Sequence, residues 1–395
     1  MNEMHDPQPG GAPAATAPAA ATAAATTGAD LSQRLCDATV GALELFAVHL
    51  GVRLGLYDAL DRHGPLTAPQ LAERAGIAPR YAREWLEQQA VAGYLAVAAP
   101  AAGPVGPSDP EPVDIGPEAR RFALPAAHRG ALVDPIDGDH LAPFAAMVVG
   151  VAQVLDEVVD AYRTGGGVPY AHYGEHFRRG QGGINRPAFT TDLVKSWLPA
   201  VPDVADRLAR GGRVADLGTG CGWSAIAVQA AWPLARVTGV DTDAASIAEA
   251  RVNAGRAGVD VRFAQPHDVG TGGADLSGLG PLDVVLVLEA LHDMSDPVGV
   301  LSAARAALAP GGVVVVADEA VAEAFVAPGD DVERMMYGWS VSHCLPASMA
   351  EAGSAALGTA LRPVTVATLA AGAGFASCDV VDVDAGFFRI YRLAA

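Results

Sequence analysis

The sequence holds two groups of residues suited to chemistry, a glycine-rich turn and a histidine among acidic side chains. The turn follows the apolar run Val214 to Leu217 and has the spacing G-x-G-x-G. Glycines let the backbone turn tightly and leave its main-chain atoms open to a ligand. Asp241 ends the next apolar run, 25 residues after Asp216. An acid at this position accepts hydrogen bonds from both hydroxyls of an adenosine ribose, so the stretch predicts a ligand that carries a nucleoside.

The spacing of the glycines separates two classes of nucleotide site. Dinucleotide enzymes use G-x-G-x-x-G/A, whose last small residue lets the helix pack closely, but Trp223 stands there in this chain. The run DLGTGCG with its downstream acid instead resembles the glycine motif of class I S-adenosylmethionine (SAM) methyltransferases. The resemblance implies SAM as the cofactor. The residues implied to bind it are Asp216, Gly218, Thr219, Gly220, Gly222, Asp241, Asp268 and Glu289.

Two alternatives belong to this interpretation. An ordinary βαβ unit can carry a glycine-rich turn without binding a cofactor, although the acid at Asp241 argues against it. Asp268 follows the third strand, where the family places an acid that bonds the adenine amine. An error of register there would give that role to His267 or Gln265.

The histidine lies in the run LVLEALHDMSDP, directly after an apolar strand. A free imidazole has a pKa near 6.5, so its neutral form is available to accept a proton. The run resembles the LHDWSD segment of small-molecule O-methyltransferases, whose histidine takes the proton from the substrate hydroxyl; Met294 stands where the family often has tryptophan. The resemblance implies His292 as general base, ahead of His172, His176 and His343. The alternative is a histidine that only caps or packs beside a turn.

Acidic residues near the histidine are candidates to orient it. The candidates are Glu289, Asp293 and the pair Asp318-Glu319, which follows the fifth strand. We rank Glu319 first as the residue that orients the imidazole, because members of the resembled family tend to keep an acid there. The predicted catalytic residues are therefore His292, Asp293 and Glu319. The predicted substrate pocket is formed by Tyr170, Tyr173, Trp197, Tyr337, Trp339 and His343, for each of which ordinary packing is the alternative. The sequence has no cluster with metal-ligand spacing, so we expect no metal.

Strands and helices alternate from Arg213 to the end of the chain. Such alternation predicts a parallel, doubly wound sheet with its ligand at the carboxyl ends of the strands. The resembled family has seven strands, the last antiparallel, and a predicted hairpin of residues 378–383 and 387–393 agrees with this. The expected fold class is α/β: a Rossmann-like, seven-stranded class I methyltransferase sheet preceded by a helical, winged-helix domain.

The first part of the chain predicts that winged-helix domain. Apolar residues recur at helical spacing from Leu31 to Leu60, and short helices and strands follow as far as residue 124. A winged helix raises the possibility of DNA binding, but Arg80 and Arg83 on its second helix are balanced by Glu84 and Glu87. A DNA-reading helix presents a basic face. We therefore expect a packing and dimerisation module, and the family resemblance implies a homodimer.

Composition narrows the partners further. The formal net charge is -19 and the sequence pI is about 4.8, so phosphate backbones and anionic lipid would repel the chain. Four scattered cysteines indicate reduced thiols and a cytoplasmic protein. The sequence has no apolar run of about 18 residues free of charge, so we expect no membrane span. Residues 1–29 have no Lys or Arg and no continuous apolar stretch, so we expect no signal peptide there. We expect no nucleic acid or membrane as partner.

These observations predict four regions. They are a disordered tail (1–29), a winged-helix dimerisation domain (30–135), a helical connector that covers the active site (136–200) and a SAM-binding methyltransferase domain (201–395). The predicted function is methyl transfer from SAM to a hydroxyl oxygen of a small organic acceptor, with His292 as general base. The alternatives are N- or C-methylation, a SAM-binding protein with other chemistry, and a winged-helix DNA-binding regulator.

Overall fold

The computed structural model describes residues 28–98, 116–268 and 276–395. The chain divides into two units, Met1–Thr39 and Val40–Ala395. The described residues of the first unit are the start of helix α1 (Gly28–Arg53), which continues into the second unit. Most of the predicted disordered tail lies outside the described residues. Its last two positions, Gly28 and Ala29, belong to α1 and are helical, not disordered.

A small winged-helix arrangement follows α1. Its sheet has the order β1-β3-β2, with both pairings antiparallel. Local sequence explains its helix ends: Gly55 adopts a left-handed conformation before α2, and Thr67 forms a capping box with Gln70 at the start of α3, which ends at Gly76. The elements are α2 (Leu56–His63), β1 (Leu66–Thr67), α3 (Ala68–Ala75), α4 (Pro79–Val91), β2 (Ala96–Ala98), β3 (Arg121–Ala123), η1 (Ala126–His128) and α5 (Arg129–Leu132).

The apolar residues from His140 to Tyr162 recur at helical spacing and predict one long helix in the connector, but the structure has two helices there. The backbone leaves helical geometry at Val154, where φ is -116° and ψ is 10°. No glycine or proline marks this break in the sequence, so the pattern of apolar residues could not reveal it. The elements of this region are α6 (Pro143–Gln153), α7 (Leu155–Thr164), η2 (Tyr170–Tyr173), α8 (Gly174–Thr190), η3 (Leu193–Trp197), α9 (Leu198–Ala200) and α10 (Val204–Ala209).

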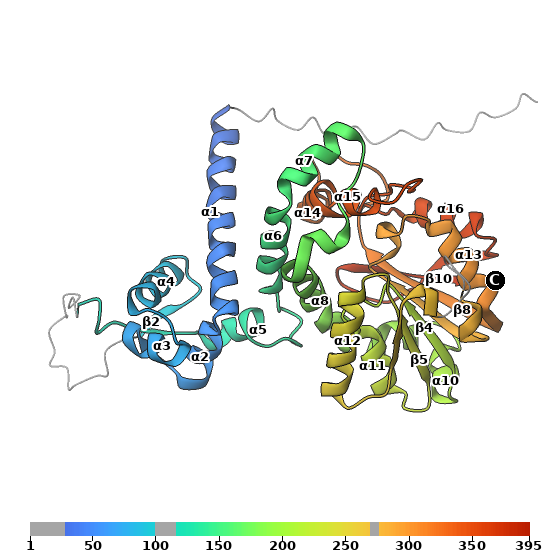
Figure 1. Ribbon diagram of the computed structural model, residues 1–395, viewed down its shortest axis with the longest axis horizontal. Helices are drawn as coiled ribbons and strands as arrows, with labels where there is room; N and C mark the ends of the chain where they lie inside the picture. The colour runs from blue at the N-terminus through green and yellow to red at the C-terminus, as the bar shows by residue number, and fades with distance from the viewer. Residues whose placement is uncertain (1–27, 99–115, 269–275) are drawn as a thin grey trace, which may run out of the picture. The chain divides into compact units, whose positions relative to one another are not determined.

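The main sheet has seven strands in the order β6-β5-β4-β7-β8-β10-β9 (Figure 1). Strands β6 to β8 are mutually parallel in this order, whereas β10 runs antiparallel to both β8 and β9. The predicted fold class, including the antiparallel last strand, is confirmed. The strands are β4 (Arg213–Leu217), β5 (Arg236–Val240), β6 (Arg262–Ala264), β7 (Leu282–Leu288), β8 (Leu308–Glu319), β9 (Ser377–Val380) and β10 (Phe388–Ala394).

Helices bury both faces of this sheet, as Figure 1 shows. Successive side chains of a strand point to opposite faces, so a strand covered on both sides needs a continuous apolar run. In β7, Leu286 and Leu288 pack on the face covered by α11 and α12, and Val285 and Val287 on the face covered by α13 and α16. The remaining elements are α11 (Trp223–Ala231), α12 (Ala244–Ala257), η4 (Pro266–Asp268), η5 (Ser277–Leu279), η6 (Leu291–Asp293), α13 (Pro297–Ala307), α14 (Asp331–Trp339), η7 (Ser340–Cys344), α15 (Leu345–Ser348) and α16 (Pro363–Gly372).

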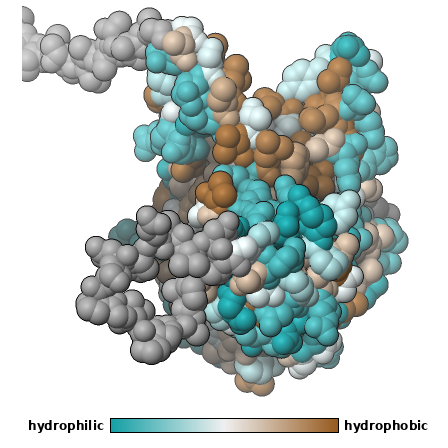
Figure 2. All heavy atoms as spheres, turned by 90° about the vertical axis from the view of Figure 1, so that its left-hand side faces the viewer, coloured by the Kyte–Doolittle hydropathy of each residue, from teal (hydrophilic) through white to brown (hydrophobic). Residues whose placement is uncertain are grey.

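Helix α1 differs from the other helices in its exposed apolar surface. By length and composition alone α1 could cross a membrane, but one such helix near the N-terminus is weak evidence for a membrane span. The sequence prediction considered only uninterrupted apolar runs, and α1 contains interspersed charges such as Arg34 and Asp37. On the face drawn in Figure 2, hydrophobic residues lie exposed among hydrophilic ones.

Candidate active site

The side chain of Asp216, near the end of β4, holds the glycine-rich turn in place through hydrogen bonds. Its carboxylate is 1% exposed, and Oδ2 accepts hydrogen bonds from the hydroxyls of Thr219 and Ser224, both at 2.6 Å. Burial raises the pKa of Asp216, and these hydrogen bonds oppose that shift. Asp216 and Thr219, both predicted to contact the cofactor, are thus bonded to each other and shape the turn.

Two of the glycines explain why the turn needs residues without side chains. Gly220 has a φ of 51°, a left-handed conformation that favours glycine, and the space beside it is open. Gly222 has a φ of 82°, and a Cβ there would meet the ring of Phe263 at 2.8 Å. Gly222 therefore serves packing, while Gly220 leaves room for a ligand against the backbone.

Asp241 follows β5 and faces the same turn. Its Oδ2 accepts from the backbone N–H of Gly220 and its Oδ1 from that of Asp243, both at 2.8 Å. Burial raises the pKa of Asp241 to about 6, against the effect of these two bonds. Each carboxylate oxygen can accept a further hydrogen bond, which is what two ribose hydroxyls require.

The predicted adenine-binding position lies beyond β6. Asp268 is half exposed, and its Oδ2 accepts from the backbone N–H of Gln265 at 3.0 Å. The Gln265 amide donates to the carbonyl of Thr242 at 3.0 Å, and His267 is largely exposed. Since the Gln265 side chain already links the ends of β5 and β6, Asp268 and His267 are the better placed alternatives for a ligand.

Glu289 begins the turn after β7 in a strained conformation. Its φ is 49°, which is uncommon for a residue other than glycine and costs energy. Its side chain is hydrogen-bonded to Asn185 of α8, while Oε2 is buried with no partner among the described residues. Burial raises the pKa of Glu289 to about 8. Strained residues of this kind are found preferentially at active sites and ligand-binding positions.

His292 lies at the centre of the acidic group. It is 2% exposed, its Nδ1 lies 2.8 Å from Asp318 Oδ1 and 3.7 Å from Glu319 Oε2, and its Nε2 lies 3.5 Å from Asp293 Oδ1. An ionised carboxylate can only accept, so Nδ1–H donates to Asp318 and Nε2 is the atom that gains or loses a proton.

The acidic surroundings raise the proton affinity of the His292 imidazole. Burial alone lowers the pKa of its imidazole, but the charges of Asp318, Asp293 and Glu319 outweigh burial and raise it well above the usual value. Burial also raises the pKa of Glu319. The direct partner is Asp318, which the sequence ranked behind Glu319. Both residues end β8, and which of them faces the histidine depends on strand register, which the sequence does not show.

Four of the predicted pocket residues form one aromatic cluster. His343 stacks on Phe177 with ring centroids 3.8 Å apart and meets Tyr173 edge-on at 4.5 Å and Tyr170 at 5.7 Å. Trp339 joins through Phe177, at 6.4 Å. Burial, then the charge of His292, lowers the pKa of His343 to about 3, so this imidazole is neutral.

Tyr170 connects this cluster to the rest of the site. Burial, followed by the charges of Asp241 and Asp293 among others, raises its pKa. The hydroxyl donates to Gln181 at 3.2 Å. The tyrosine is therefore near both the predicted ribose-binding acid and the acid beside His292.

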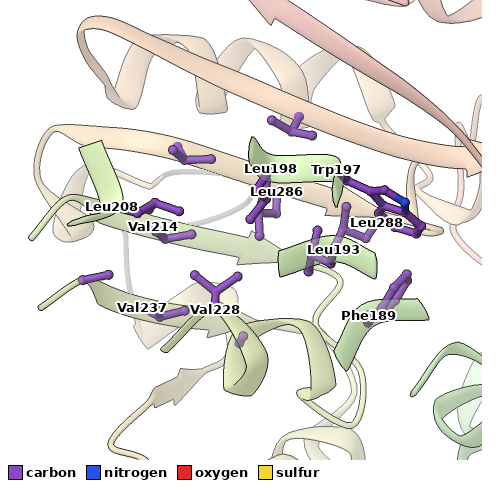
Figure 3. Packing of buried hydrophobic residues seen from close by; sticks show 14 of the residues in the cluster. Phe189, Leu193, Trp197, Leu198, Leu208, Val214, Val228, Val237, Leu286 and Leu288 are labelled. Carbon is purple, nitrogen blue, oxygen red and sulfur yellow. The ribbon is translucent and has the colours of Figure 1, made fainter. Parts of the chain in front are cut away.

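Two predicted pocket residues lie elsewhere. Trp197 is 1% exposed in a hydrophobic core against one face of the main sheet (Figure 3). Its ring contacts those of Phe189 and Phe388. Tyr337 is 39% exposed and contacts Phe325. Trp197 and Tyr170 both lie in residues 168–204, a stretch rich in Tyr, His, Arg and Trp, so composition alone could not separate a core residue from a pocket residue.

The sequence placed Cys344 in the insertion that helps form the acceptor pocket of the resembled family, but it did not indicate that Cys344 lies beside His292 or that Asn185 contacts Glu289. Within the described chain, ligand atoms of His292, Asp293 and Cys344 lie within 4.8 Å of one another, and so do those of His292, Asp318 and Glu319. The expectation of no metal rested on residue spacing along the chain. Cys344 is far from His292 in the sequence, and the fold brings the two side chains together. The only sequence signal was its position in the insertion between β8 and α16.

Comparisons with known proteins agree with this fold. Residues 189–352 match the model of a methyltransferase domain, and residues 41–102 match that of an Rv2258c-like winged helix-turn-helix domain. No curated protein matches the chain.

Solved structures extend the likeness to nearly the whole chain. Mitomycin 7-O-methyltransferase MmcR is 20% identical, with a TM-score of 0.61 over 93% of this chain and 98% of that one. Human N-acetylserotonin methyltransferase, solved with SAM, is 16% identical, with a TM-score of 0.64 over 92% and 97%. CalO1, a methyltransferase of calicheamicin biosynthesis solved with bound SAH, is 18% identical, with a TM-score of 0.58 over 93% and 99%. At these identities the likeness establishes the fold: a class I methyltransferase domain preceded by a winged-helix domain.

Proposed function

We propose that this protein is a SAM-dependent methyltransferase that acts on a hydroxyl oxygen of a small organic acceptor. The observation that carries the proposal is the position of His292 in the turn after β7, with Nδ1 held by Asp318 and Nε2 left to exchange a proton. The matches to a methyltransferase domain and to O-methyltransferase structures support the same reaction class.

The residues of the glycine turn fit SAM. Asp241 has one free acceptor position on each carboxylate oxygen for the ribose hydroxyls, and Gly220 offers open space beside the backbone. Glu289 has an unpaired buried oxygen that can receive a donor. SAM supplies an activated methyl group on a sulfonium, so the protein has mainly to position the acceptor in line with it.

His292 supplies the base. As the acceptor oxygen forms its bond to carbon, its proton moves to Nε2 of the imidazole. Asp318 holds the ring through Nδ1–H at 2.8 Å and stabilises the imidazolium that results. Asp293, with a quarter of its side chain exposed, lies 3.5 Å from Nε2 and can pass the proton towards solvent. General-base assistance of this kind contributes about 10² to 10⁴-fold to a rate.

The proposal is tested by incubating purified protein with SAM carrying a labelled methyl group and a metabolite extract, then identifying labelled products. Label on an oxygen supports the proposal. Label on nitrogen or carbon would support the alternative methylations, and tight SAM binding without any labelled product would support other chemistry on the same fold.

A DNA-binding function has less support. On α4, Arg80 pairs with Glu84 and Arg83 with Glu87 at 4.0 Å, so the helix offers DNA no free row of cations. A salt-dependent gel shift with a specific DNA sequence would favour the regulator instead.

The proposed assembly is a homodimer formed through α1. Its exposed apolar side chains include Leu31, Leu35, Leu43 and Leu50, each at least half exposed. A row of this kind on one helix favours burial against another protein surface. The four cysteines are free thiols, which agrees with a cytoplasmic location.

A further inference from the structure

Cys344 is a buried thiol for which the proposed methyl transfer has no use. It ends the π-helical turn η7 and is 5% exposed. Its Sγ lies 3.4 Å from Nδ1 of the neighbouring His343, and the charges of Asp293 and His292 act on the thiol. Nitrogen, oxygen and sulfur donors from His292, Asp293 and Cys344 converge, all within 4.8 Å of one another. Short π-helical turns occur frequently at functional sites.

The distances within this group suit a shared ion better than a hydrogen bond. His292 Nε2 and Asp293 Oδ1 are 3.5 Å apart, and Oδ1 is buried without a hydrogen-bond partner in the described part of the chain. Zinc lies about 2.0 to 2.2 Å from nitrogen and oxygen ligands in tetrahedral sites, which places two such ligands roughly 3.3 Å apart. The observed pair is close to that separation.

The other side of the imidazole has the arrangement that metal-bound histidines require. A histidine ligand usually donates its second N–H to a carboxylate, which fixes the ring, and Nδ1 of His292 does so to Asp318 at 2.8 Å. That distance is too short for both atoms to be ligands of one ion. The group containing Asp318 and Glu319 is therefore the supporting shell, and the group containing Asp293 and Cys344 is the better candidate site.

We propose that His292 Nε2, Asp293 Oδ1 and Cys344 Sγ form a binding site for zinc or a similar soft divalent cation, with a fourth position open. Imidazole, carboxylate and thiolate together suit zinc. Burial raises the pKa of the Cys344 thiol to about 12, so the ion must displace the thiol proton as well as any proton on Nε2, both of which leave to solvent. The ionised thiolate and carboxylate balance the two positive charges.

This site has a consequence for activity that rests on the proposed function. A cation on Nε2 occupies the lone pair with which His292 accepts the substrate proton, so zinc inhibits methyl transfer and a chelator restores it. Binding itself does not depend on methyl transfer, and the two claims can fail separately.

The test is a titration of chelator-treated, full-length protein with Co²⁺ alone, followed by absorption spectroscopy. We expect one equivalent to bind, with the intense visible bands of tetrahedral cobalt and a near-ultraviolet thiolate charge-transfer band. Cys344→Ser should abolish the charge-transfer band, and Asp293→Asn should weaken binding by at least roughly tenfold, as losses of metal-site groups do. A Cys36→Ser/Cys378→Ser variant, which lacks the exposed and half-buried thiols, should retain the band.

A second measurement keeps the proposal testable if a variant does not fold. X-ray absorption at the zinc edge of the zinc-loaded wild-type protein should show one sulfur ligand at about 2.3 Å. Absence of a charge-transfer band in the wild type, a zinc shell without sulfur, or a band that survives Cys344→Ser would overturn the site. Bound zinc that leaves methyl transfer unchanged would instead overturn the assignment of His292 as base.

Discussion

Replacing Asp241 by asparagine removes the charge that we propose holds the ribose of SAM while keeping the size of the side chain. The carboxylate accepts from Gly220 N–H and Asp243 N–H at 2.8 Å, and the amide oxygen of asparagine can keep only one of these bonds. A hydrogen bond to a charged group contributes about 1.5 to 3 kcal/mol. The dissociation constant of SAM should therefore rise by roughly 10- to 100-fold.

Isothermal titration calorimetry with SAM and with S-adenosylhomocysteine measures this change directly. Asp260→Asn is a matched control, because Asp260 is exposed and precedes β6 at the amino end of the sheet, away from the glycine turn. Thermal unfolding shows whether either variant has lost its fold. SAM binding unchanged in Asp241→Asn, or absent from the wild type, would refute the assigned cofactor site.

Three further outcomes follow from the same contacts. SAM affinity should be constant above about pH 7 and fall as the pH drops through about 6, because burial raises the pKa of Asp241 to about 6 and protonation removes the acceptor charge; a flat calorimetric profile from pH 7 to about 5 would contradict this. Asp318→Asn should lower kcat by about 10- to 100-fold with KM for SAM nearly unchanged, because it loses a charge-assisted bond to His292; steady-state kinetics that show only a raised KM would count against the role. Leu35→Glu combined with Leu43→Glu should convert a dimer into a monomer in light scattering, since both side chains are at least 60% exposed on α1; a variant that stays dimeric would exclude α1 as the interface.

The sequence was sufficient to predict the sheet and the glycine turn, because both follow from local patterns. Strands buried on two faces require continuous apolar runs such as the one in β7, and the turn requires glycines where φ is positive, as at Gly220. The family resemblance implied the antiparallel last strand, and the hairpin predicted at residues 378–383 and 387–393 agreed with it. The parallel pairing of strands distant in the chain, such as β4 with β7, was predicted from the alternation of strands and helices.

The details of the site could not be predicted because they depend on contacts between the side chains of distant residues. Asp318 rather than Glu319 meets the His292 ring through the register of β8, and Cys344 reaches it through a turn in the insertion after β8. Trp197 and Tyr170 come from the same aromatic-rich segment, but one packs against one face of the main sheet and the other lies near Asp241. The direction in which each side chain points is decided by helix packing, which composition does not encode.

The most direct test of the proposed reaction is the rate of methyl transfer by His292→Ala. The acceptor should be a weakly acidic hydroxyl compound found in the labelled-SAM screen, since an ionised one would not need a base. Turnover should fall by about 10² to 10⁴-fold while SAM affinity stays nearly unchanged. His172→Ala, at an exposed histidine paired with Glu157 at 2.7 Å, should retain full activity. Near-full turnover by His292→Ala on such an acceptor would contradict the role of His292 and leave the buried cluster around it a structural one.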